Sequence, residues 1–468
     1  MSDLFSLLVQ SGASLGVQSA VIATAGQNVA NANTPGYSRQ IANLAANPAL
    51  LSSGAAAVGT GVSLQSITQA RDQFVERQIP TALASQAYSQ SENTALQSIS
   101  ALDPDLAGGL PSTLGAFYSS LRTLAQNPGD PALRQAAIGS SQGLARSFNQ
   151  TVSSIEDART GIDARIAGDV ADINATATQL SALNKRIQIA KSSASTPNDL
   201  MDQRQAAIDK LAQLTGGTSY TNGAGDISIS LPGGIALVTD SGAAQVSAVP
   251  DPANGGHLKL SYMRADGSGP VVLPMSSMGG EVGGFVAARD GAMKTAVTSL
   301  DQFAFNLGTS VNAIHAANYA MDGTTGRPLF TIPATSSGAA SQIAVNATVA
   351  ADPRLLAAAA ALPAVSGDNR GILAMISTET QALASGSDPV SSLQQIVTSF
   401  GSSTAQAKVL ADHDGALAAH LKQLRDSTSG VSIDEEMINL TKAQKVYEAM
   451  AKVISTTNAM LDTLMSLK

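Results

Sequence analysis

Two segments of the sequence match the nucleophile-elbow pattern G-x-S-x-G, in which an activated serine attacks a carbonyl carbon. Ser14 stands at the centre of residues 12–16, and Ser141 stands at the centre of residues 139–143. The motif works only on a sharp turn between a strand and a helix, because such a turn pushes the serine out of the backbone. Both segments lie within runs of helical periodicity, so we interpret them as chance matches.

The four histidines, at positions 257, 315, 413 and 420, include no H-E-x-x-H motif and no pair one helical turn apart. His413 is the best candidate for acid-base chemistry or metal binding, because Asp412 and Asp414 flank it. Adjacent residues on a helix point in different directions. A solvated helix face is therefore the better interpretation.

An acidic cluster near the C-terminus, Asp434, Glu435 and Glu436, could hold a cation. Acidic residues are also favoured at the start of a helix, where they complement the helix dipole. We interpret the cluster as a helix start, with Ser432 or Asp434 as the N-cap.

Other patterns for chemistry are missing from the sequence. It contains no cysteine, which removes disulfides, thiolate metal sites and cysteine nucleophiles. Gly59 and Gly61 lack the third glycine and the strand context of a dinucleotide-binding fingerprint, and there is no Walker P-loop. We therefore predict no enzyme activity, no cofactor and no metal site.

Composition indicates a mainly helical, acidic protein. The 468 residues allow about two to four domains. Hydrophobic residues make up 44%, but with only 9 Phe, 7 Tyr and no Trp they must be mostly aliphatic, which favours helices. The net charge of −8 disfavours a nucleic-acid partner. The first basic residue is Arg39, so we expect no cleaved signal peptide, and we expect no apolar run of the roughly 18 residues that a membrane span needs.

Both ends of the chain carry a sustained 4-3 spacing, which predicts two helices with coiled-coil-like stripes. The N-terminal stripe ends at residues 33–36, where Pro35 and Gly36 predict a loop. The large apolar residues predicted to pack the terminal helices together are Leu4, Leu8, Leu15, Ile22, Val29, Ile433, Met437, Leu440, Ile454 and Leu461.

The middle of the chain combines long helices with a short-strand region. We expect helices over residues 67–100, 131–191, 200–214, 284–320, 371–383 and 389–425. Short strands are expected over residues 226–231, 235–239, 243–249, 257–262 and 270–273, which indicate a small β domain inserted into a helical one.

The predicted fold class is therefore mainly α with an inserted β domain. Two matching terminal helices with a β region between them favour a hairpin-like path, in which the chain runs out along one set of helices and returns along another. We expect an inner coiled-coil domain from residues 1–64 and 430–468, a helical-bundle rod from 65–217 and 281–429, and a small outer β domain from 218–280.

Three segments resemble known flagellar proteins. Residues 28–40 are similar to the N-terminal signature of the rod, hook and hook-associated proteins of bacterial flagella, and their Tyr-Ser-Arg-Gln ending resembles the hook-associated protein 1 (FlgK) family. The C-terminus of that family is resembled by residues 429–437, 444–447 and 459–461. The family's segment before the variable outer domain is resembled by residues 198–204 together with 209–211. The residues that carry the terminal motifs are Asn28, Asn31, Asn33, Pro35, Gly36, Tyr37, Ser38, Arg39, Gln40, Gly430, Val431, Asp434, Glu435, Glu436, Gln444 and Tyr447.

This resemblance implies a structural subunit that joins the flagellar hook to the filament and assembles through its terminal helices. The implied partners are further copies of the chain in a helical or ring assembly, the hook protein, the second hook-associated junction protein and an export chaperone at the C-terminal helix. The implied location is extracellular, at the hook-filament junction, after export from the cytoplasm without signal cleavage.

Two alternatives remain open. A hook or distal-rod subunit would share the terminal signatures, but a hook protein is expected to have a mostly β middle, whereas this chain has long helices there. A filament-associated hydrolase would use the inserted domain, whose candidate residues Asp226, Asp240, Asp251, His257 and Asp266 are scattered through turns.

Overall fold

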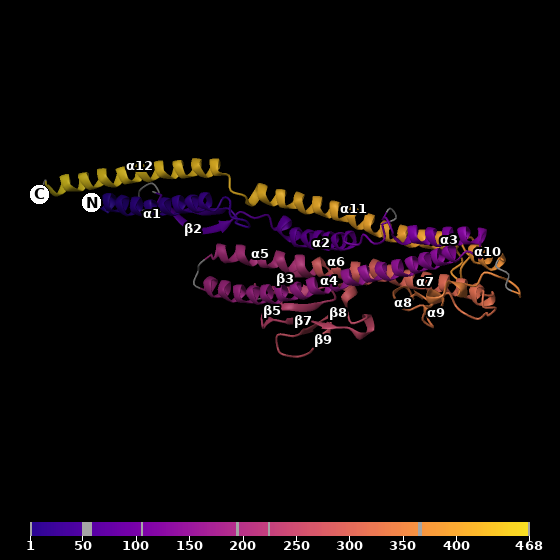
Figure 1. Ribbon diagram of the computed structural model, residues 1–468. Coiled ribbons are helices and arrows are strands. Elements are labelled where there is room, and N and C mark those ends of the chain that lie inside the picture. Colours follow the sequence, from indigo (N-terminus) through magenta and orange to yellow (C-terminus); the bar gives the residue numbers. More distant parts are fainter. Residues whose placement is uncertain are drawn as a thin grey trace.

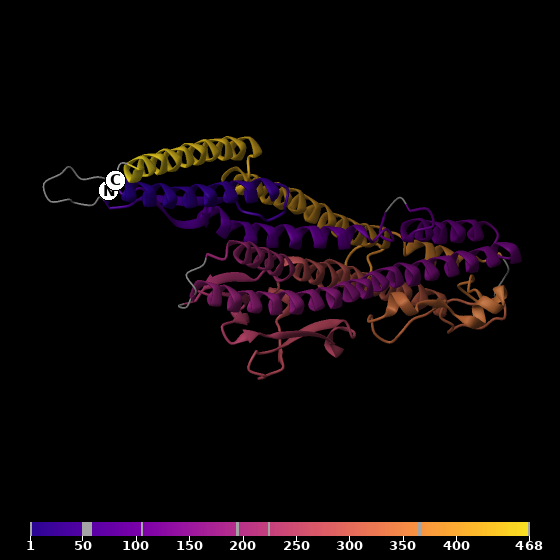
Figure 2. The ribbon, with the colours of Figure 1, turned by 90° about the vertical axis from the view of Figure 1, so that its left-hand side faces the viewer.

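The computed structural model describes residues 2–48, 59–103, 106–192, 196–222, 225–363 and 367–466. The molecule is elongated, with the two chain ends close together at one tip (Figure 1, Figure 2). It is mainly helical, with small sheets inserted in the middle of the chain, which confirms the predicted fold class. The division into three domains with the predicted boundaries stays a prediction.

The tip consists of the two terminal helices, α1 (Ser2–Ala30) and α12 (Ile433–Ser466), which lie side by side and run in opposite directions (Figure 1). We call them the terminal pair. A two-stranded antiparallel hairpin, β1 (Gln40–Ala46) and β2 (Val62–Gln69), follows α1.

The expected helix over residues 67–100 is wrong at its start, because residues 67–69 belong to β2. Helix α2 (Gln73–Gln97) begins after Asp72, whose carboxylate accepts the N–H groups of Phe74 and Val75. This N-cap fixes the helix start, and the β-branched Val62 and Ile67 fit the strand that precedes it.

Long helices packed along one another form the body of the molecule, which we call the rod. Its helices are α2, α3 (Leu110–Gln126), α4 (Pro131–Ser192), α5 (Asn198–Thr215), α6 (Gly280–Ala287), α7 (Lys294–Ala317), α10 (Arg370–Ser377) and α11 (Pro389–Ser429). A π-helical turn over residues 288–293 joins α6 to α7. Helix α4 runs along most of the rod and confirms the prediction for residues 131–191.

The expected helix over residues 371–383 is too long, since α10 ends at Ser377. The hydroxyls of Ser377 and Thr378 donate to the carbonyls of Ala374 and Met375 at 2.7 Å. Such local side-chain bonds compete with helix propagation. The region before α10 contains short elements, namely β10 (Phe330–Thr331), α8 (Ala339–Gln342), β11 (Ala344–Val345) and α9 (Ala347–Ala351).

The inserted β region contains the expected short strands, except that residues 243–249 divide between two sheets and β3 was not expected. One antiparallel sheet has the order β3 (Thr218–Thr221), β4 (Ile227–Leu231), β5 (Ile235–Thr239), β6 (Gly242–Ala243). A second has the order β7 (Gln245–Pro250), β8 (Leu258–Met263), β9 (Val271–Val272). The two ends of the insert meet, because the N–H of Gly279 donates to the carbonyl of Thr215 at 3.2 Å.

Helix α4 packs directly against the insert. Insert residues such as Leu237 and Leu260 belong to one hydrophobic cluster with Ile166 of α4. Asn174 of α4 also pairs with the backbone of Val246 in both directions, each bond being 2.8 Å. The insert therefore shares its core with the rod.

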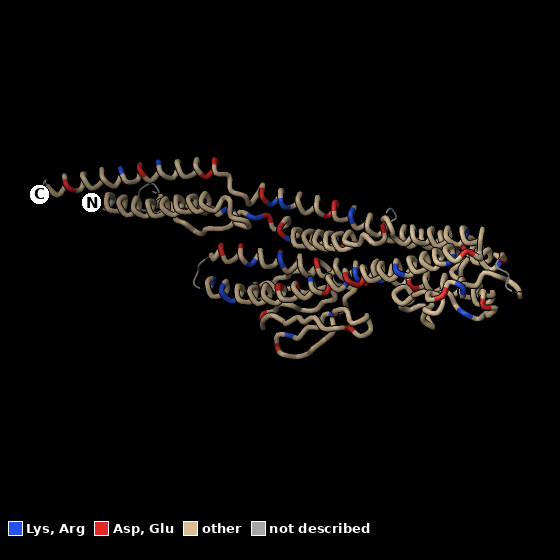
Figure 3. Tube along the Cα trace, in the orientation of Figure 1, with Lys and Arg blue, Asp and Glu red and all other residues tan. Residues whose placement is uncertain are grey.

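One helix departs from the expectation about membranes. The segment Leu4–Ala30 is long and apolar enough to cross a membrane by length and composition, with a mean hydropathy of 1.3 over its best 18-residue window. Figure 3 shows this helix without charged residues from position 4 onward. The expectation that no segment has this length and apolar character is therefore wrong, although core helices and N-terminal signal sequences pass the same test.

Candidate functional site: the joint between the terminal pair and the rod

The chain leaves α1 through a tight loop, as predicted from Pro35 and Gly36. Asn31 caps the helix end by donating its side-chain amide to the carbonyl of Gln27 at 3.0 Å, and its oxygen accepts the hydroxyl of Thr34 at 3.2 Å. Gly36 has a φ of 80°, a left-handed conformation that favours glycine. This turn directs residues 37–40 back toward α1.

Asn28, in the last turn of α1, is the centre of the hydrogen bonds that hold this loop, and it is only 1% exposed. Its amide nitrogen donates to the carbonyl of Gln40 at 2.9 Å and to Glu436 Oε2 at 3.1 Å. Its oxygen accepts the Tyr37 hydroxyl at 2.9 Å and the Gln40 N–H at 2.9 Å. All the hydrogen-bonding capacity of the buried amide is used, so an asparagine fits this position better than any apolar residue.

Glu436 connects both terminal helices to the loop. Its side chain is 4% exposed and accepts the Arg39 Nε–H at 2.7 Å in addition to the bond from Asn28. Arg39 also contacts Glu435 at 3.3 Å, but the Glu435 side chain is 63% exposed. Ser432 caps α12, with its carbonyl accepting the Glu436 N–H at 3.0 Å, which confirms the interpretation of the acidic cluster as a helix start.

A second carboxylate, Asp202 of α5, holds the loop from the side of the rod. Asp202 Oδ1 accepts the Ser38 hydroxyl at 2.8 Å and an Arg71 Nη at 2.5 Å. The Arg71 Nε–H donates to the Ser38 hydroxyl at 3.1 Å. Nearby, Asn198 donates its amide to the carbonyl of Ile67 at 3.0 Å, which ties β2 to the start of α5.

The three segments singled out in the sequence therefore meet in space. Residues 28–40, 198–204 and 429–437 form one hydrogen-bonded joint between the terminal pair and the rod. Sequence patterns did not indicate the contact between Ser38 and Asp202, and Arg71 was not singled out. No local pattern marks Arg71, because its partners Ser38 and Asp202 lie 33 and 131 positions away in the sequence.

Burial raises the pKa of Tyr37 to about 12, and the negative charges of Asp199, Asp202 and Glu436 act in the same direction. The phenol therefore stays protonated and keeps donating to Asn28 over the physiological pH range. Tyr37 is a structural hydrogen-bond donor in this joint.

The other motif residues have varied positions. Asn33, Pro35 and Gly36 are exposed at the loop tip, and Asp434 and Gln444 are exposed on α12. Gly430 ends α11, and a Cβ there would overlap the carbonyl oxygen of Asp426. The half-buried Val431 follows it at the elbow between α11 and α12.

The contact face of the terminal pair is built mainly from small and polar residues. The buried positions are Ser11, Ser14, Val17, Thr24, Ala25 and Asn28 on α1, with Glu436, Ala443 and Thr457 on α12. The predicted residues Leu4, Leu8, Leu15, Ile22, Val29, Leu440, Ile454 and Leu461 are half-buried.

Two of the residues predicted to pack on α12, together with the motif residue Tyr447, are largely exposed within one chain. Ile433 is 47% exposed, Met437 is 48% exposed and Tyr447 is 41% exposed. Glu436 must face α1 to reach Asn28, and the small Ala443 lets the helices approach closely on the same face. Ile433, Met437 and Tyr447 are therefore largely open to solvent in one chain, and the packing of the terminal helices through the predicted residues stays a prediction.

Two grooves border the joint. One of about 310 Å³ lies between α1, β1 and α12, with Val21, Ile41, Leu44 and Val446 among its lining residues. Another of about 520 Å³ lies between the loop tip and the elbow at Gly430. Both are open at the surface next to the exposed motif residues.

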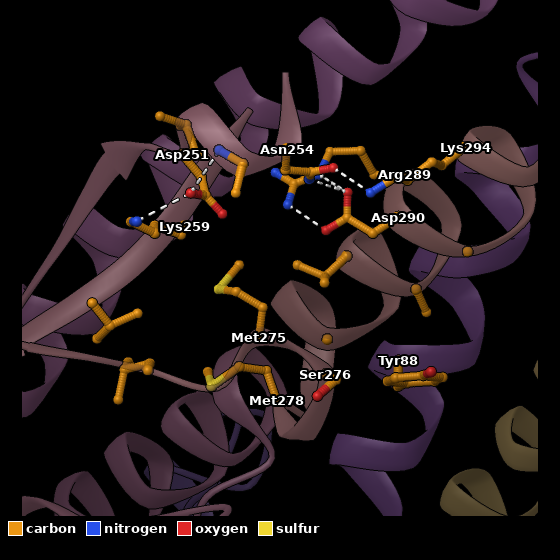
Figure 4. Close-up of a pocket in the computed structure, with 18 residues that line it drawn as sticks. Tyr88, Asp251, Asn254, Lys259, Met275, Ser276, Met278, Arg289, Asp290 and Lys294 are labelled. Atoms are coloured by element: carbon orange, nitrogen blue, oxygen red, sulfur yellow. Dashed lines mark hydrogen bonds and ion pairs between the residues drawn. The ribbon is translucent and has the colours of Figure 1, made fainter. Parts of the chain in front are cut away.

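A larger cavity of about 720 Å³ lies far from the joint, between the insert and the π-helical turn (Figure 4). Its charged residues pair with one another. Lys259 contacts Asp251 at 3.1 Å, and Asp290 accepts from Arg289 at 2.7 Å and from Asn254 at 2.8 Å (Figure 4). The contact between Asn254 and Asp290 fastens the insert to the rod.

His257, a candidate of the hydrolase alternative, is a buried contact residue. Its Nδ1 lies 2.7 Å from Asp163 Oδ2 and its Nε2 lies 3.3 Å from Glu156 Oε2, both on α4. Asp226, Asp240 and Asp266 lie at turns, where the carboxylates of Asp240 and Asp266 accept nearby backbone N–H groups. Ser14 and Ser141 lie within α1 and α4, which confirms their interpretation as chance matches. Among the described residues, no group of His, Asp and Glu side chains could hold a metal ion.

Comparison with known families agrees with this arrangement. The family model described as the flagellar hook-associated protein FlgK helical domain matches residues 96–330. The model described as the flagellar basal body rod FlgEFG protein C-terminal matches residues 422–467. This chain belongs to the FlgK family.

Relatives align with nearly the whole chain. Flagellar hook-associated protein 1 of Escherichia coli K12 is 26% identical over 554 residues, covering 99% of this chain and 100% of that protein. The protein of the same name from Bacillus subtilis strain 168 is 27% identical over 502 residues, covering 99% and 98%. The flagellar hook junction protein FlgK from Burkholderia pseudomallei shares the fold, with a TM-score of 0.68 and 17% identity over 75% of this chain and 100% of that chain.

Membership of the FlgK family makes this chain a structural component of the bacterial flagellum that assembles with other flagellar components. The resemblance inferred from residues 28–40 and 429–447 is thereby confirmed.

Proposed function

We propose that this chain is the subunit that joins the flagellar hook to the filament. The observation that carries the proposal is the joint itself, in which the segments around Asn28, Asp202 and Glu436 lock the terminal pair onto a long helical rod. The full-length relatives are named hook-associated protein 1 and the solved relative is named a hook junction protein, and both names support the same role.

Assembly through the terminal pair is supported by the apolar residues that it leaves open to solvent. The exposed large apolar residues on α1 and α12 include Phe5, Leu7, Val9, Ile433, Met437, Ile438, Val446, Met460, Leu464 and Met465. A concentration of large exposed apolar residues on two paired helices is typical of an interaction site. Copies of the chain in a ring or helix would cover it through head-to-tail contacts between two different faces.

The further partners follow from this position between two structures. The hook protein would contact the assembly on one side, and the second hook-associated junction protein on the other. Before assembly, an export chaperone would cover the exposed face of α12. The chain would leave the cytoplasm without cleavage of a signal peptide and function outside the cell.

One observation favours the alternative of a hook or distal-rod subunit. The C-terminal match over residues 422–467 is to a model described for basal body rod FlgEFG proteins. The match of the FlgK helical domain to residues 96–330, which include all of α4, favours the junction role over this alternative.

Deletion of the gene in the source bacterium tests the proposal. We expect cells with complete hooks that lack filaments and release filament protein into the medium, and restoration of attached filaments by a plasmid copy. Filaments attached at normal frequency in the deletion strain would contradict the junction role. Loss of the hooks themselves would instead support the hook or rod alternative.

A further inference from the structure

The loop after α1 is held by two carboxylates that belong to different parts of the molecule. Glu436 belongs to the terminal pair, and its side chain is 4% exposed. Asp202 belongs to α5 of the rod, and its side chain is 11% exposed. Residues 37–40 therefore link the terminal pair to the rod, and their contacts couple the orientation of one to that of the other.

Ser38, Arg71 and Asp202 form a closed triangle of hydrogen bonds. Ser38 donates to Asp202 at 2.8 Å, Arg71 donates to Asp202 at 2.5 Å, and Arg71 donates to the Ser38 oxygen at 3.1 Å. The backbone N–H of Ser38 adds a bond to the second Asp202 oxygen at 3.3 Å. Each side chain contacts the other two, so none can turn without breaking two bonds.

This triangle fixes both ends of the β1–β2 hairpin. Ser38 lies between α1 and β1, whereas Arg71 lies between β2 and α2. Asn198 holds β2 itself through Ile67 and Gln69, at 3.0 and 2.9 Å, but has no hydrogen bond to Ser38 or Arg71, which lie just outside the two strands. Loss of Asp202 would thus leave the strand on α5 while freeing the two connections beside it.

We propose that Asp202 is the positioning residue that sets the tilt of the terminal pair relative to the rod, whereas Glu436 sets the pairing of α1 with α12. The consequence for assembly rests on the proposed function. Subunits with one fixed tilt would present their terminal pairs to neighbours in a single orientation, as a regular array requires.

The test uses distances between spin labels in the purified full-length chain, measured by double electron–electron resonance. The sequence contains no cysteine, so labels can be placed at introduced cysteines alone. A449C on α12 with A206C on α5 reports the tilt, and A13C with A449C reports the pairing within the terminal pair. All three positions are exposed. A171C on α4 with A206C is the control within the rod.

D202N removes the charge that pairs with Arg71 and one of the two acceptor oxygens, whereas S38A removes both bonds of the Ser38 hydroxyl and leaves the ion pair between Asp202 and Arg71 in place. D199N is the matched control, because Asp199 is an exposed acid on the same helix with a single 3.4 Å contact to Gln40.

We expect D202N and S38A to broaden the tilt distance distribution at least twofold and to leave the pairing distribution unchanged. E436Q should broaden the pairing distribution, and D199N should change neither. An unchanged tilt distribution in both D202N and S38A, or a wild-type distribution as broad as theirs, would overturn the proposal. Because these distances are measured in the isolated chain, the result does not depend on whether the chain joins hook to filament. The gene deletion tests that role separately.

Discussion

At the scale of single residues, the joint depends on buried polar groups whose partners lie far apart in the sequence. Asn28 and Glu436 are separated by 408 positions and still share a hydrogen bond of 3.1 Å. No local pattern reveals such a contact, so the sequence identified these residues only through their resemblance to a family. Their contacts explain the residue types, since a buried carboxylate must be paired and hydrogen-bonded.

Glu436→Gln should weaken the terminal pair. The substitution removes the charge that pairs with Arg39 and puts an amide donor near the Asn28 amide, so we expect a loss of about 2 to 3 kcal/mol. Glu435→Gln is the matched control, because its exposed contact should contribute less than about 0.5 kcal/mol. Hydrogen exchange of α12 measures both. Equal protection of α12 in the two variants would show that Glu436 is not a key contact.

Asp169 on α4 predicts a dependence of stability on pH. Burial raises its pKa from 3.8 to about 7, the charge of Glu281 adds to the effect, and its Oδ2 has no hydrogen-bond partner. A carboxyl whose folded pKa is raised favours the folded state at low pH, and this contribution is lost as the pH rises from 3.8 through about 7.

Asp169→Asn should therefore stabilise the chain at pH 8, by about 1 kcal/mol after allowing for solvent screening of this half-buried group, and have little benefit at pH 4. Urea unfolding at both pH values measures the difference. Asp157→Asn, at an exposed site on the same helix, is the control. A benefit of equal size at both pH values would rule out titration of Asp169 as the cause.

At the scale of elements, helix packing in the rod requires glycine where α6 crosses α2. A Cβ on Gly284 would overlap the carbonyl oxygen of Tyr88, whereas a Cβ on Gly168 of α4 would meet nothing within 4 Å. The same substitution should thus have opposite effects at the two sites.

Gly284→Ala should destabilise the chain by about 2 kcal/mol or more, because a packed backbone must move to admit the methyl group. Gly168→Ala should raise stability by up to about 1 kcal/mol through helix propensity. Thermal unfolding followed by circular dichroism compares the two. A neutral Gly284→Ala variant would mean that α2 and α6 pack less closely than the structure has them.

Sequence periodicity predicted the elements well where one pattern was long and consistent. Helix α4 carries its apolar residues at helical spacing, and Ile162, Ile166 and Val170 are all buried. The strand β2 was missed. Its last three residues, 67–69, were assigned to the helix that follows, and its earlier residues were assigned to no element. The contact face of α12 could not be fixed from sequence, because this helix has apolar residues on more than one side and the buried contact of Glu436 with Asn28 lies on the side that meets α1.

At the scale of the whole molecule, the out-and-back path places both chain ends at one tip and the β insert on one flank of the rod (Figure 1). Helix α1 has no charged residue from position 4 onward and both helices of the tip expose apolar side chains, whereas charged residues are scattered along α12, the rod and the insert (Figure 3). The exposed apolar side chains of the tip suit a subunit that assembles through its tip and presents the rest of its surface to solvent. Composition predicted the helical class of the fold, but only the three-dimensional path shows that residues 28–40, 198–204 and 429–437 form one joint.

The location of the chain on intact flagella tests the central claim most directly. A short peptide tag inserted at the exposed turn after Asp266, between β8 and β9, lies on the insert and leaves the joint unchanged. Gold-labelled antibody against this tag, viewed by electron microscopy, should mark a single band where the hook meets the filament. Label spread along the hook, along the filament or at the flagellar base would contradict the assignment of this chain to the junction.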